Sequence, residues 1–455
     1  MNLTDTIAAI ATASGEAGIS VVRVSGADAF AIADRVFQCQ GRTPSERPGG
    51  TFAVGHVVEG NQLIDQALLL IMRAPHSYTC EDVVEIQGHG GSQSARRILR
   101  CVLDAGARLA NPGEFTQRAF LNGRLDLVQA EAVLDLIHAR SDRAAAAALD
   151  QLEGRLSQQF NALYDHLIAI ASDIEATLDF PEDELPETVM PDILKRSHAS
   201  LGWMRELIDS WDEGHLLRDG AWVVISGKPN VGKSTLLNGL LGRDRAIVTD
   251  TPGTTRDTIE EDLVIGGLPI RLVDTAGVRD THCEIEKMGI QRTHSHVQRA
   301  DLHIYIIDAT QPIDEQEINN LSTTPENRRL LLRNKIDLTD NAPKISGDIA
   351  LLNVALTQTI YVEQVKNAIC DILSRRIDLQ ARPHAAISER HRNLLVDAHI
   401  EMEAAVDMLS TTGDEVVALV SSRMRTVLDY LGTVTGRTYQ EELLDNIFTR
   451  FCIGK

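Results

Sequence analysis

Hydrophobic positions in the first 120 residues follow two different periods. Five segments have the apolar or alternating pattern of short strands: residues 7–11, 19–24, 51–58, 63–72 and 82–87. Residues 27–37 have a helical period, and a second helix is expected from Gly91 to about Gly106. A loop rich in Gly, Pro and Ser separates these elements over residues 41–50. The pattern predicts an α+β domain over residues 1–120.

Between about residues 124 and 217 the apolar positions recur every three or four residues, as on amphipathic helices. This spacing starts at Leu125, Leu127 and Val128, and it continues over residues 144–149 and 160–178. The acidic segment 181–186 breaks it and has the composition of a solvated loop. One further helix is expected over residues 191–211. We therefore assign residues 121–217 to a helical domain.

Residues 218–378 alternate strand-like and helical segments, which predicts a doubly wound α/β domain with a mostly parallel sheet. Helical periodicity returns in the last segment, residues 379–455, over 384–409, 416–431 and 439–450. The α/β domain thus interrupts a helical domain, an arrangement that is feasible because domain termini often lie close together. The expected fold class is multidomain α/β and α+β.

Composition narrows the possible partners and the compartment. The chain has 455 residues with 44 basic and 65 acidic side chains, a net charge of −21, so bulk charge does not favour nucleic acid binding. The six cysteines form no C-x-x-C pair, which indicates neither a disulfide framework nor a zinc site. We expect a reducing, cytoplasmic location, since no long apolar run or signal peptide is visible.

The segment Gly227–Ser234 matches the phosphate-binding pattern G-x-x-x-x-G-K-[ST] at every fixed position. A strand-like run, residues 221–226, leads into it, and a helical run, residues 235–241, follows. Glycines allow backbone N–H groups to surround phosphates at a helix N-terminus. Lys233 would contact the β- and γ-phosphates, and the Ser234 hydroxyl would bind magnesium.

Three more motifs follow in the order that a GTPase requires. Thr255, in Gly253–Asp257, could supply a second hydroxyl to magnesium. Asp274 and Gly277 form a D-x-x-G motif, in which the carboxylate holds magnesium through water and the glycine N–H reaches the γ-phosphate. The motif Asn334–Asp337, N-K-x-D, offers a carboxylate that accepts two hydrogen bonds from guanine, so GTP is favoured over ATP.

Two positions depart from the usual GTPase pattern. Residues 353–356 occupy the place of the base-contacting Ser-Ala-x motif, but they lack the serine and retain Ala355. Val278 follows the D-x-x-G motif where many GTPases carry a water-orienting glutamine. Either hydrolysis is slow or another group orients the water, and the loop that follows offers Asp280, Glu284 and Glu286.

The segment Gly88–Gly91, G-H-G-G, precedes a predicted helix and could receive an anion. A tight turn, with His89 in a structural role, is the preferred interpretation of this segment.

These motifs occur together with Pro112–Phe115, Arg118–Gly123 and the ending Phe451–Lys455. In this combination the chain resembles the MnmE (TrmE) family of tRNA-modification GTPases over its whole length. The resemblance implies a folate-binding-like N-terminal domain that forms a homodimer. It also implies a flavoprotein partner, MnmG (GidA). The two proteins would install an aminomethyl or carboxymethylaminomethyl group at carbon 5 of the tRNA wobble uridine, from a one-carbon tetrahydrofolate.

The resemblance also implies roles for particular residues. The folate site would comprise Arg23, Glu85, Arg124 and Lys455, with Arg124 standing where some members have lysine. Potassium ligands would be Asn230, Thr249, Thr251 and Thr254. Glu286 would orient the attacking water, and Cys452 is either catalytic or a small structural residue. The full set expected at GTP is Asn230, Val231, Gly232, Lys233, Ser234, Thr235, Thr249, Asp250, Thr251, Pro252, Gly253, Thr254, Thr255, Asp274, Thr275, Ala276, Gly277, Asn334, Lys335 and Asp337.

Two other functions remain open at this point. A ribosome-assembly or RNA-binding GTPase would need no modification chemistry, but neither a C-terminal cysteine nor an acidic chain favours RNA docking as the main role. A nucleotide-gated interaction protein would remain possible if the N-terminal domain bound no folate.

Overall fold

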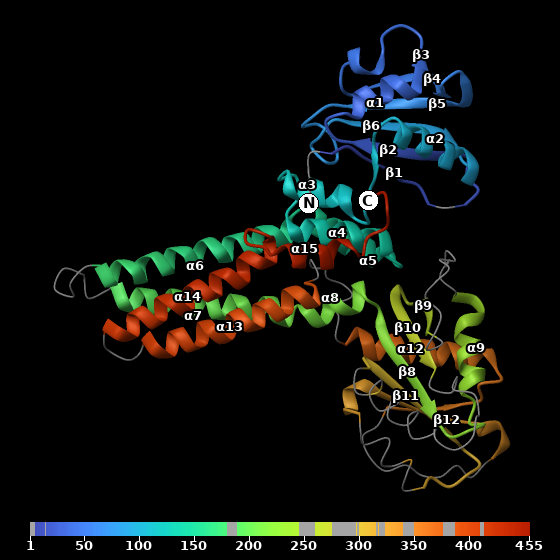
Figure 1. Cartoon of the computed structure of the whole chain (residues 1–455). Coiled ribbons are helices and arrows are strands. Elements are labelled where there is room, and N and C mark those ends of the chain that lie inside the picture. The colour runs from blue at the N-terminus through green and yellow to red at the C-terminus, as the bar shows by residue number, and fades with distance from the viewer. Residues whose placement is uncertain are drawn as a thin grey trace, which may run out of the picture. The chain divides into compact units, whose positions relative to one another are not determined.

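The computed structural model describes residues 5–13, 15–179, 189–244, 260–274, 297, 300–314, 317, 324–339, 350–375, 387–409 and 414–455. Contacts divide the chain into two compact units (Figure 1). The first unit comprises residues 1–134, 157–164 and 428–455, and the second comprises residues 135–156 and 165–427. No helix among the described residues is long and apolar enough to cross a membrane.

The first unit contains a seven-stranded sheet of order β3-β4-β5-β6-β2-β1-β7. Its strands are β1 Ile7–Ile10, β2 Ile19–Ser25, β3 Phe37–Cys39, β4 Thr51–Glu59, β5 Gln62–Met72, β6 Val83–His89 and β7 Arg108–Leu109. All neighbours are antiparallel except β1 and β7. The five expected strands are confirmed, whereas β3 and β7 were not expected. Strand β6 also continues through Gly88 and His89, which the sequence pattern assigned to a turn.

Helices α1 (Ala29–Val36) and α2 (Ser92–Asp104) cover one face of this sheet. Val22 and Val24 of β2 pack there against residues such as Ile32 and Ile98. Because side chains alternate along a strand, Arg23 and its cross-strand neighbour Glu85 lie on the opposite face.

Part of that opposite face is covered by helix α3 (Glu114–Leu121), where Phe115 packs with Ile7 and Ala9. The sequence pattern did not predict α3, because its polar residues do not mark a solvent face. Glu114 and Arg118 are both buried, and they form an ion pair of 3.0 Å within the helix. Because these charged residues are buried, the helix lacks the separation of apolar and polar faces from which helices are predicted.

Helix α15 (Glu441–Phe448) and the residues after it belong to the same unit. Gly113 has φ +68°, and a Cβ there would lie 2.5 Å from the carbonyl oxygen of Phe448. Gly454 has φ +99°, and a Cβ there would lie 2.3 Å from the carbonyl oxygen of Ile10. Both glycines therefore permit close approach of the C-terminal segment to the N-terminal domain.

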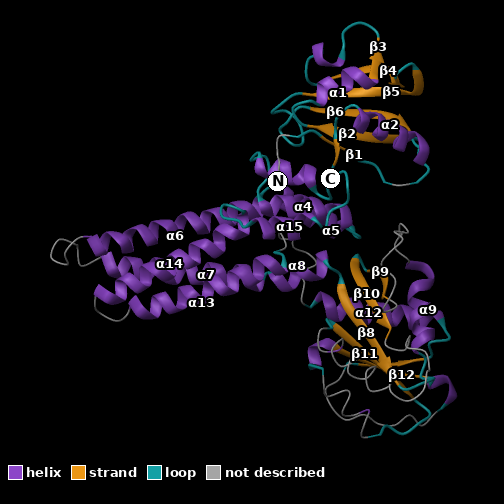
Figure 2. Cartoon of the chain, in the orientation of Figure 1, coloured by secondary structure: helices purple, strands orange, loops and turns teal. Residues whose placement is uncertain are grey.

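The second unit contains a six-stranded sheet of order β13-β12-β11-β8-β10-β9 (Figure 2). The strands are β8 Ala221–Gly227, β9 Glu260–Ile265, β10 Leu268–Asp274, β11 Leu302–Asp308, β12 Arg329–Asn334 and β13 Leu351–Val354. Only β9 runs antiparallel to its neighbour, as expected for a mostly parallel doubly wound domain. Helices α9 (Lys233–Asp244) and α12 (Thr359–Ser374) pack on it through Leu236, Leu240 and Ile369.

The remaining helices confirm the helical segments on either side of the α/β domain. They are α4 Leu127–His138, α5 Asp142–Leu152, α6 Arg155–Asp179, α7 Val189–Asp209, α8 Trp211–Arg218, α13 Glu389–Leu409 and α14 Asp414–Thr435. The single helix expected over residues 191–211 ends earlier, and α8 is additional. The Ser210 hydroxyl donates to the carbonyl oxygen of Leu207 at 2.7 Å, which competes with helical bonding at this junction.

Candidate functional site

The phosphate-binding loop lies between the carboxyl end of β8 and the start of α9. Gly227 has φ +146°, and a Cβ there would lie 2.3 Å from the carbonyl oxygen of Ile306. Gly232 has φ +112°, and its Cβ would lie 2.3 Å from Asn334 Nδ2. Both positions therefore require glycine for conformation and for space.

Polar groups of this loop are arranged for an anion. Lys233 Nζ donates to the carbonyl oxygens of Gly227 at 2.9 Å and Lys228 at 2.7 Å, so its ammonium group lies over the loop. Asn230 takes the left-handed conformation, φ 62°, that lets a tight loop turn back on itself. Ser234 and Thr235 are exposed in the first turn of α9. Backbone N–H groups at such a helix start attract phosphate.

The base-recognition motif is tied directly to the phosphate loop. Asn334 Nδ2 donates to the carbonyl oxygen of Val231 at 2.7 Å, and Asn334 Oδ1 accepts from the N–H of Leu356 at 3.0 Å. Lys335 has φ 67°, and its Nζ lies 2.6 Å from Asp308. Asp337 is exposed and available to a base. Asn334 thus joins the two motifs and the serine-free segment 353–356, in which Ala355 is buried.

A buried histidine beneath the loop was not identified from the sequence. His303, on β11, is only 2% exposed. Its Nε2 lies 2.7 Å from the hydroxyl of Ser226, which directly precedes the loop, and its Nδ1 lies 2.9 Å from the hydroxyl of Thr324. Burial lowers the pKa of His303 to about 4, so the ring is neutral at physiological pH. A lone histidine in an apolar strand gave no signal for this role.

Several expected nucleotide contacts lie outside the described residues. These are Thr249, Asp250, Thr251, Pro252, Gly253, Thr254, Thr255, Thr275, Ala276, Gly277 and Glu286. The backbone of Asp274 ends β10, but its side chain is also outside the description. Val278, the unusual residue after the D-x-x-G motif, belongs to the same group.

Two of the four residues expected at the folate site, Arg23 and Arg124, lie against one aromatic ring in the first unit, and a third, Glu85, pairs with Arg23. Arg23 Nε donates to Glu85 Oε1 at 2.8 Å, and both side chains are largely buried, with 16% and 15% exposed. The Arg23 guanidinium lies 5.4 Å from the centre of the Tyr78 ring, and that of Arg124 lies 5.2 Å from it. The structure thus brings Arg23, Glu85 and Arg124 into one cluster that includes Tyr78.

Tyr78 belongs to a loop between β5 and β6 that gave no motif in the sequence. Its hydroxyl lies 2.9 Å from the Thr116 hydroxyl, and burial raises the pKa of the phenol. Arg23 also lies 5.5 Å from the ring centre of Phe115. The two guanidinium groups on aromatic surfaces provide a cationic, partly apolar cluster next to one carboxylate.

The loop that carries Tyr78 is held from both sides. Arg124 donates to the carbonyl oxygen of Ser77, and Asn122 Nδ2 donates to that of Thr79 at 2.6 Å. The Ser25 hydroxyl donates to Glu81 at 2.6 Å. Fixed partners at the start, middle and end of this loop keep the Tyr78 ring in place.

Buried ion pairs anchor the end of the same loop. Arg118 is 1% exposed and contacts Glu81 at 3.2 Å and Asp5 at 2.7 Å. Hydrogen bonding to Arg108, together with that to Arg118, holds the pKa of Asp5 below its usual value despite the opposing effect of burial. The Asp5 carboxylate therefore remains charged and keeps Arg118 paired.

The remaining expected residues of the first unit are placed less completely. Lys455 is half-buried and follows Gly454, whose backbone lies against β1. Cys452 is exposed, and the other cysteines in the described part of the chain are also free thiols. His89 Nδ1 and the buried Asp65 form a contact of 2.6 Å, and a Cβ at Gly90 would meet the carbonyl oxygen of Ala17 at 2.0 Å. A carboxylate and tight packing favour a structural role over an anion site here.

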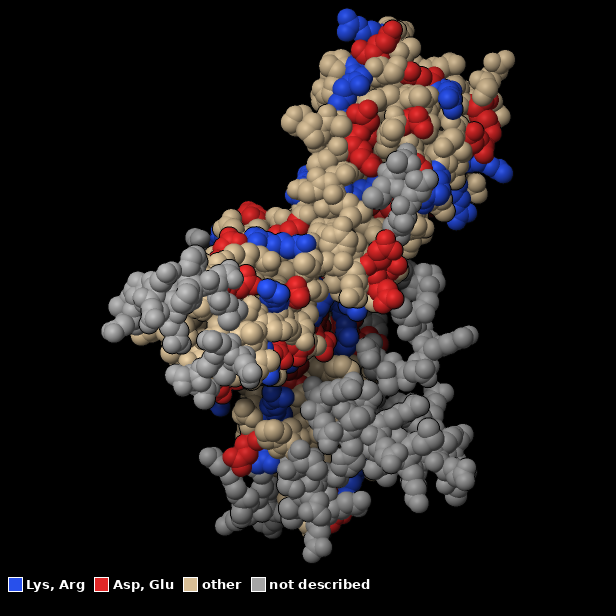
Figure 3. All heavy atoms as spheres, turned by 60° about the vertical axis from the view of Figure 1, so that its left-hand side comes forward, with Lys and Arg blue, Asp and Glu red and all other residues tan. Residues whose placement is uncertain are grey.

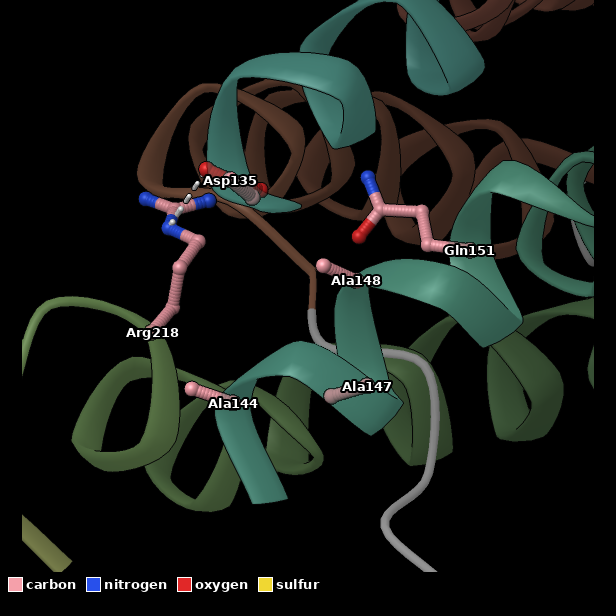
Figure 4. Close-up of a pocket in the computed structure, with 6 residues that line it drawn as sticks. All are labelled: Asp135, Ala144, Ala147, Ala148, Gln151 and Arg218. Carbon is pink, nitrogen blue, oxygen red and sulfur yellow. Dashed lines mark ion pairs between the residues drawn. The ribbon is translucent and has the colours of Figure 1, made fainter. Parts of the chain in front are cut away.

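A pocket lies within the second unit and contains none of the expected residues (Figure 4). It encloses about 280 Å³ including its open mouth. Asp135 and Arg218 face each other at one side, 3.8 Å apart, and alanines of α5 line the rest with Gln151. Methyl groups around a single ion pair offer no reactive chemistry, so we regard it as a gap in helix packing.

Comparison with known proteins places the chain in a family. A family model described as the MnmE helical domain matches residues 127–452, and a model described as GTP-binding protein TrmE N-terminus matches residues 6–124. The chain belongs to the MnmE family. Curated relatives carry the name tRNA modification GTPase MnmE. That of Geobacter sulfurreducens is 44% identical over 463 residues, and that of Alkaliphilus metalliredigens is 42% identical over 465 residues, each covering 100% of both chains.

A third MnmE relative, from Symbiobacterium thermophilum, is 44% identical and covers 99% of both chains. Among solved structures, the G domain of T. maritima FeoB covers 33% of this chain and 98% of its own at 24% identity, with a TM-score of 0.25. So low a structural similarity adds nothing to the assignment. MnmE membership confirms the expected family and the expectation of a GTPase linked to tRNA modification.

Proposed function

We propose that this MnmE family member is a potassium-activated GTPase that acts with a flavoprotein partner, MnmG (GidA), in the cytoplasm. Together they would install an aminomethyl or carboxymethylaminomethyl group at carbon 5 of the tRNA wobble uridine, using a one-carbon tetrahydrofolate. The observation that carries the proposal is the coexistence in one chain of a phosphate loop and the Arg23–Glu85–Arg124 cluster. Full-length similarity to proteins named tRNA modification GTPase MnmE supports the combination.

The described part of the nucleotide site fits GTP and magnesium. Gly227 and Gly232 let the loop pack closely against Ile306 and Asn334, and the ammonium of Lys233 already lies over the loop. The exposed Ser234 hydroxyl would hold magnesium, and the exposed Asp337 carboxylate would accept hydrogen bonds from guanine. Asn230 would be a potassium ligand together with Thr249, Thr251 and Thr254, and Glu286 would orient the attacking water.

The N-terminal cluster fits a folate by its chemistry. Folates carry glutamyl carboxylates, which arginine binds bidentately, and a pterin ring, which hydrogen-bonds to a carboxylate. Arg23 and Arg124 would provide the cations, and Glu85 the carboxylate. Tyr78 would limit the site at its base, with Lys455 contributing from the C-terminal segment. Bound folate would supply the one-carbon unit, and Cys452 would act on or position the substrate.

An exposed apolar surface supports a homodimer through the N-terminal domain. Phe52, Val54 and Leu68 are 66%, 57% and 38% exposed. They occupy the sheet face opposite α1 and α2, because their neighbours along β4 and β5 belong to the covered core. Leu70 on the same face is paired in register with Glu85, so this surface is continuous with the cluster. Exposed apolar patches of this kind mark protein interfaces.

Steady-state kinetics in two salts test the potassium dependence. We expect GTP hydrolysis at least about tenfold faster in potassium than in sodium, which corresponds to ~1.4 kcal/mol of activation barrier. Glu286→Ala should slow hydrolysis while GTP still binds. Equal rates in the two salts would show that potassium is not the activator.

A second assay separates modification from hydrolysis. The variant Cys452→Ser, combined with partner, tRNA, GTP and a one-carbon tetrahydrofolate, should leave GTP hydrolysis near the wild-type rate and abolish modified wobble uridine. Nucleoside mass spectrometry measures the product. Modification at the wild-type level would reduce Cys452 to a structural residue.

A further inference from the structure

Helix α2 exposes three arginines on one side. Its buried residues Ala95, Ile98 and Val102 face the sheet. Arg96, Arg97 and Arg100 are all exposed, so they occupy the opposite, solvent-facing side of the helix. We call these three residues the α2 arginine ridge.

The α2 arginine ridge forms no ion pair in the described part of the chain, although Asp104, four residues after Arg100, carries a negative charge on the same helix. Neither an ion pair nor a hydrogen bond joins any of its three guanidinium groups to a described residue, although the chain carries 65 acidic and 44 basic side chains. Other arginines are paired: Arg108, Arg196 and Arg423 each contact a carboxylate. On the surface drawn in Figure 3, basic side chains commonly lie beside acidic ones.

This arrangement is unfavourable for the isolated helix. Arg96 and Arg100 are four residues apart and therefore adjacent on the helix surface, where like charges are destabilising. Asp104, the single acidic residue of α2, is four residues after Arg100 and so lies beside Arg100, but it is not adjacent to Arg96 or Arg97. Arg35 adds a fourth positive charge at the C-terminal end of α2, since its Nη1 donates to the carbonyl oxygen of Ala105 at 2.7 Å. Unpaired like charges on one face indicate an anionic partner.

The guanidinium group of arginine indicates which anionic groups the partner carries. This planar group binds phosphate oxygens through two parallel hydrogen bonds, whereas pairing with a protein carboxylate would already be available within this acidic chain. Arg96 and Arg100 are separated by about 6 Å along the helix axis, a spacing suited to neighbouring phosphates of one nucleic acid strand. A row of regularly spaced phosphates matches the ridge better than a single small anion does.

We propose that the α2 arginine ridge binds the phosphate backbone of the tRNA substrate. This inference rests on the proposed function, because it takes tRNA as the nucleic acid that the chain meets. Local positive charge on α2 would offset the repulsion between RNA and a chain of net charge −21. Since the contacts are to phosphates, the ridge contributes affinity and orientation but no base selectivity.

The test compares tRNA binding by the full-length chain and two charge-matched variants. Arg96→Gln with Arg100→Gln removes two charges from the ridge. The control, Lys195→Gln with Arg205→Gln, removes two charges from exposed positions of α7. Fluorescence anisotropy with a labelled tRNA transcript gives affinity over a range of potassium chloride concentrations. Thermal unfolding and GTP hydrolysis establish that both variants are folded.

We expect the ridge variant to bind tRNA about tenfold to a hundredfold more weakly at low salt. Its plot of log affinity against log salt should be shallower by about 1.5–2, because fewer counterions are released. The control should match the wild type. Equal affinity and slope in the ridge variant would overturn the inference while leaving the proposed function intact. Loss of flavoprotein binding with unchanged tRNA binding would also overturn it, and would identify a protein-docking surface. Failure of the wild-type chain to bind tRNA would overturn both proposals.

Discussion

The two candidate anion sites of this molecule are built in different ways. In the α/β domain the phosphate loop relies mainly on backbone: Gly227 and Gly232 have positive φ, and the Lys233 ammonium lies over the loop. In the N-terminal domain the site relies on side chains, with Arg23 and Arg124 against Tyr78 and with Glu85 beside them. A site formed by backbone groups tolerates substitution of its side chains but not of its glycines. A site formed by side chains should instead lose affinity when one of those side chains is removed.

The two sites also differ in how their binding groups are held in place. Arg23, Arg124 and the loop of Tyr78 are fixed by hydrogen bonds to neighbouring elements before any ligand binds. Preorganised side chains lose little conformational entropy on binding. The phosphate loop is preorganised mainly through Asn334, which connects it to the base-recognition motif. A disturbance at Asn334 should therefore reach both ends of a bound nucleotide.

We expect the largest effect from adding one methyl group to the phosphate loop. In Gly232→Ala the new Cβ would lie 2.3 Å from Asn334 Nδ2 at a φ of +112°. We expect GTP affinity to fall by at least a hundredfold, or about 3 kcal/mol, through strain and steric conflict. Isothermal titration calorimetry measures it. Gly242→Ala is the control, because nothing lies within 4 Å of that position in α9. Equal losses in both variants would contradict the comparison.

The side-chain-built site should fail when one carboxylate is removed. In Glu85→Ala, Arg23 loses the partner that it contacts at 2.8 Å. Tetrahydrofolate affinity should fall below detection, a loss of at least about 2–3 kcal/mol, because an ionic contact and a preorganised cation are lost together. GTP hydrolysis should persist, since the two sites lie in separate units. Calorimetry with unchanged folate affinity would show that Glu85 is outside the site.

A smaller effect concerns the pH-dependent stability that the buried His303 side chain contributes beneath the phosphate loop. The pKa of His303 is lowered by burial from 6.5 to about 4, so the unfolded chain binds its proton more readily. Stability from this residue is complete above pH 6.5 and is lost as the pH falls toward 4. We expect about 1.5–2 kcal/mol less stability at pH 5 than at pH 7. Denaturant unfolding of wild type and His303→Gln should show a weaker pH dependence in the variant.

The smallest effect comes from backbone strain in the side-chain-built site. Cys80 has φ 59° in the loop that carries Tyr78, a conformation that glycine adopts without penalty. We expect Cys80→Gly to raise the free energy of unfolding by about 0.5–1 kcal/mol, the relief of strain being partly offset by chain entropy. Thermal melts measure this difference. Cys39→Gly is the control, because Cys39 lies in β3, and it should destabilise the protein.

The sequence predicted the elements whose polar and apolar residues separate cleanly. The five strands, the two helices that cover the N-terminal sheet and the α/β alternation all follow from periodicity. Helix α3 escaped prediction because Glu114 and Arg118 are buried together. Strand β7 has two residues, too few for any periodic signal.

Site residues were likewise predicted where they are close together in the sequence and missed where they are far apart. Local motifs located the phosphate loop and Asn334, because their residues are close in sequence. Nothing in the sequence indicated Tyr78 or His303, whose roles come from contacts between residues far apart in the chain. Tyr78 meets Thr116 of α3, and His303 meets Ser226 of β8. Such pairings depend on strand order and packing, which periodicity does not encode.

The division of the chain into units has a consequence for its biosynthesis. The first unit combines residues 1–134 with residues 428–455, which leave the ribosome about 300 residues later. At about 5–20 residues per second, the N-terminal sheet would wait roughly 15–60 s for α15. During that interval the surface of Gly113 that receives Phe448 is uncovered, while the α/β domain can fold. Translation rate over the inserted domain, and chaperones that shield apolar surface, should therefore govern how much of the nascent chain reaches the complete first unit.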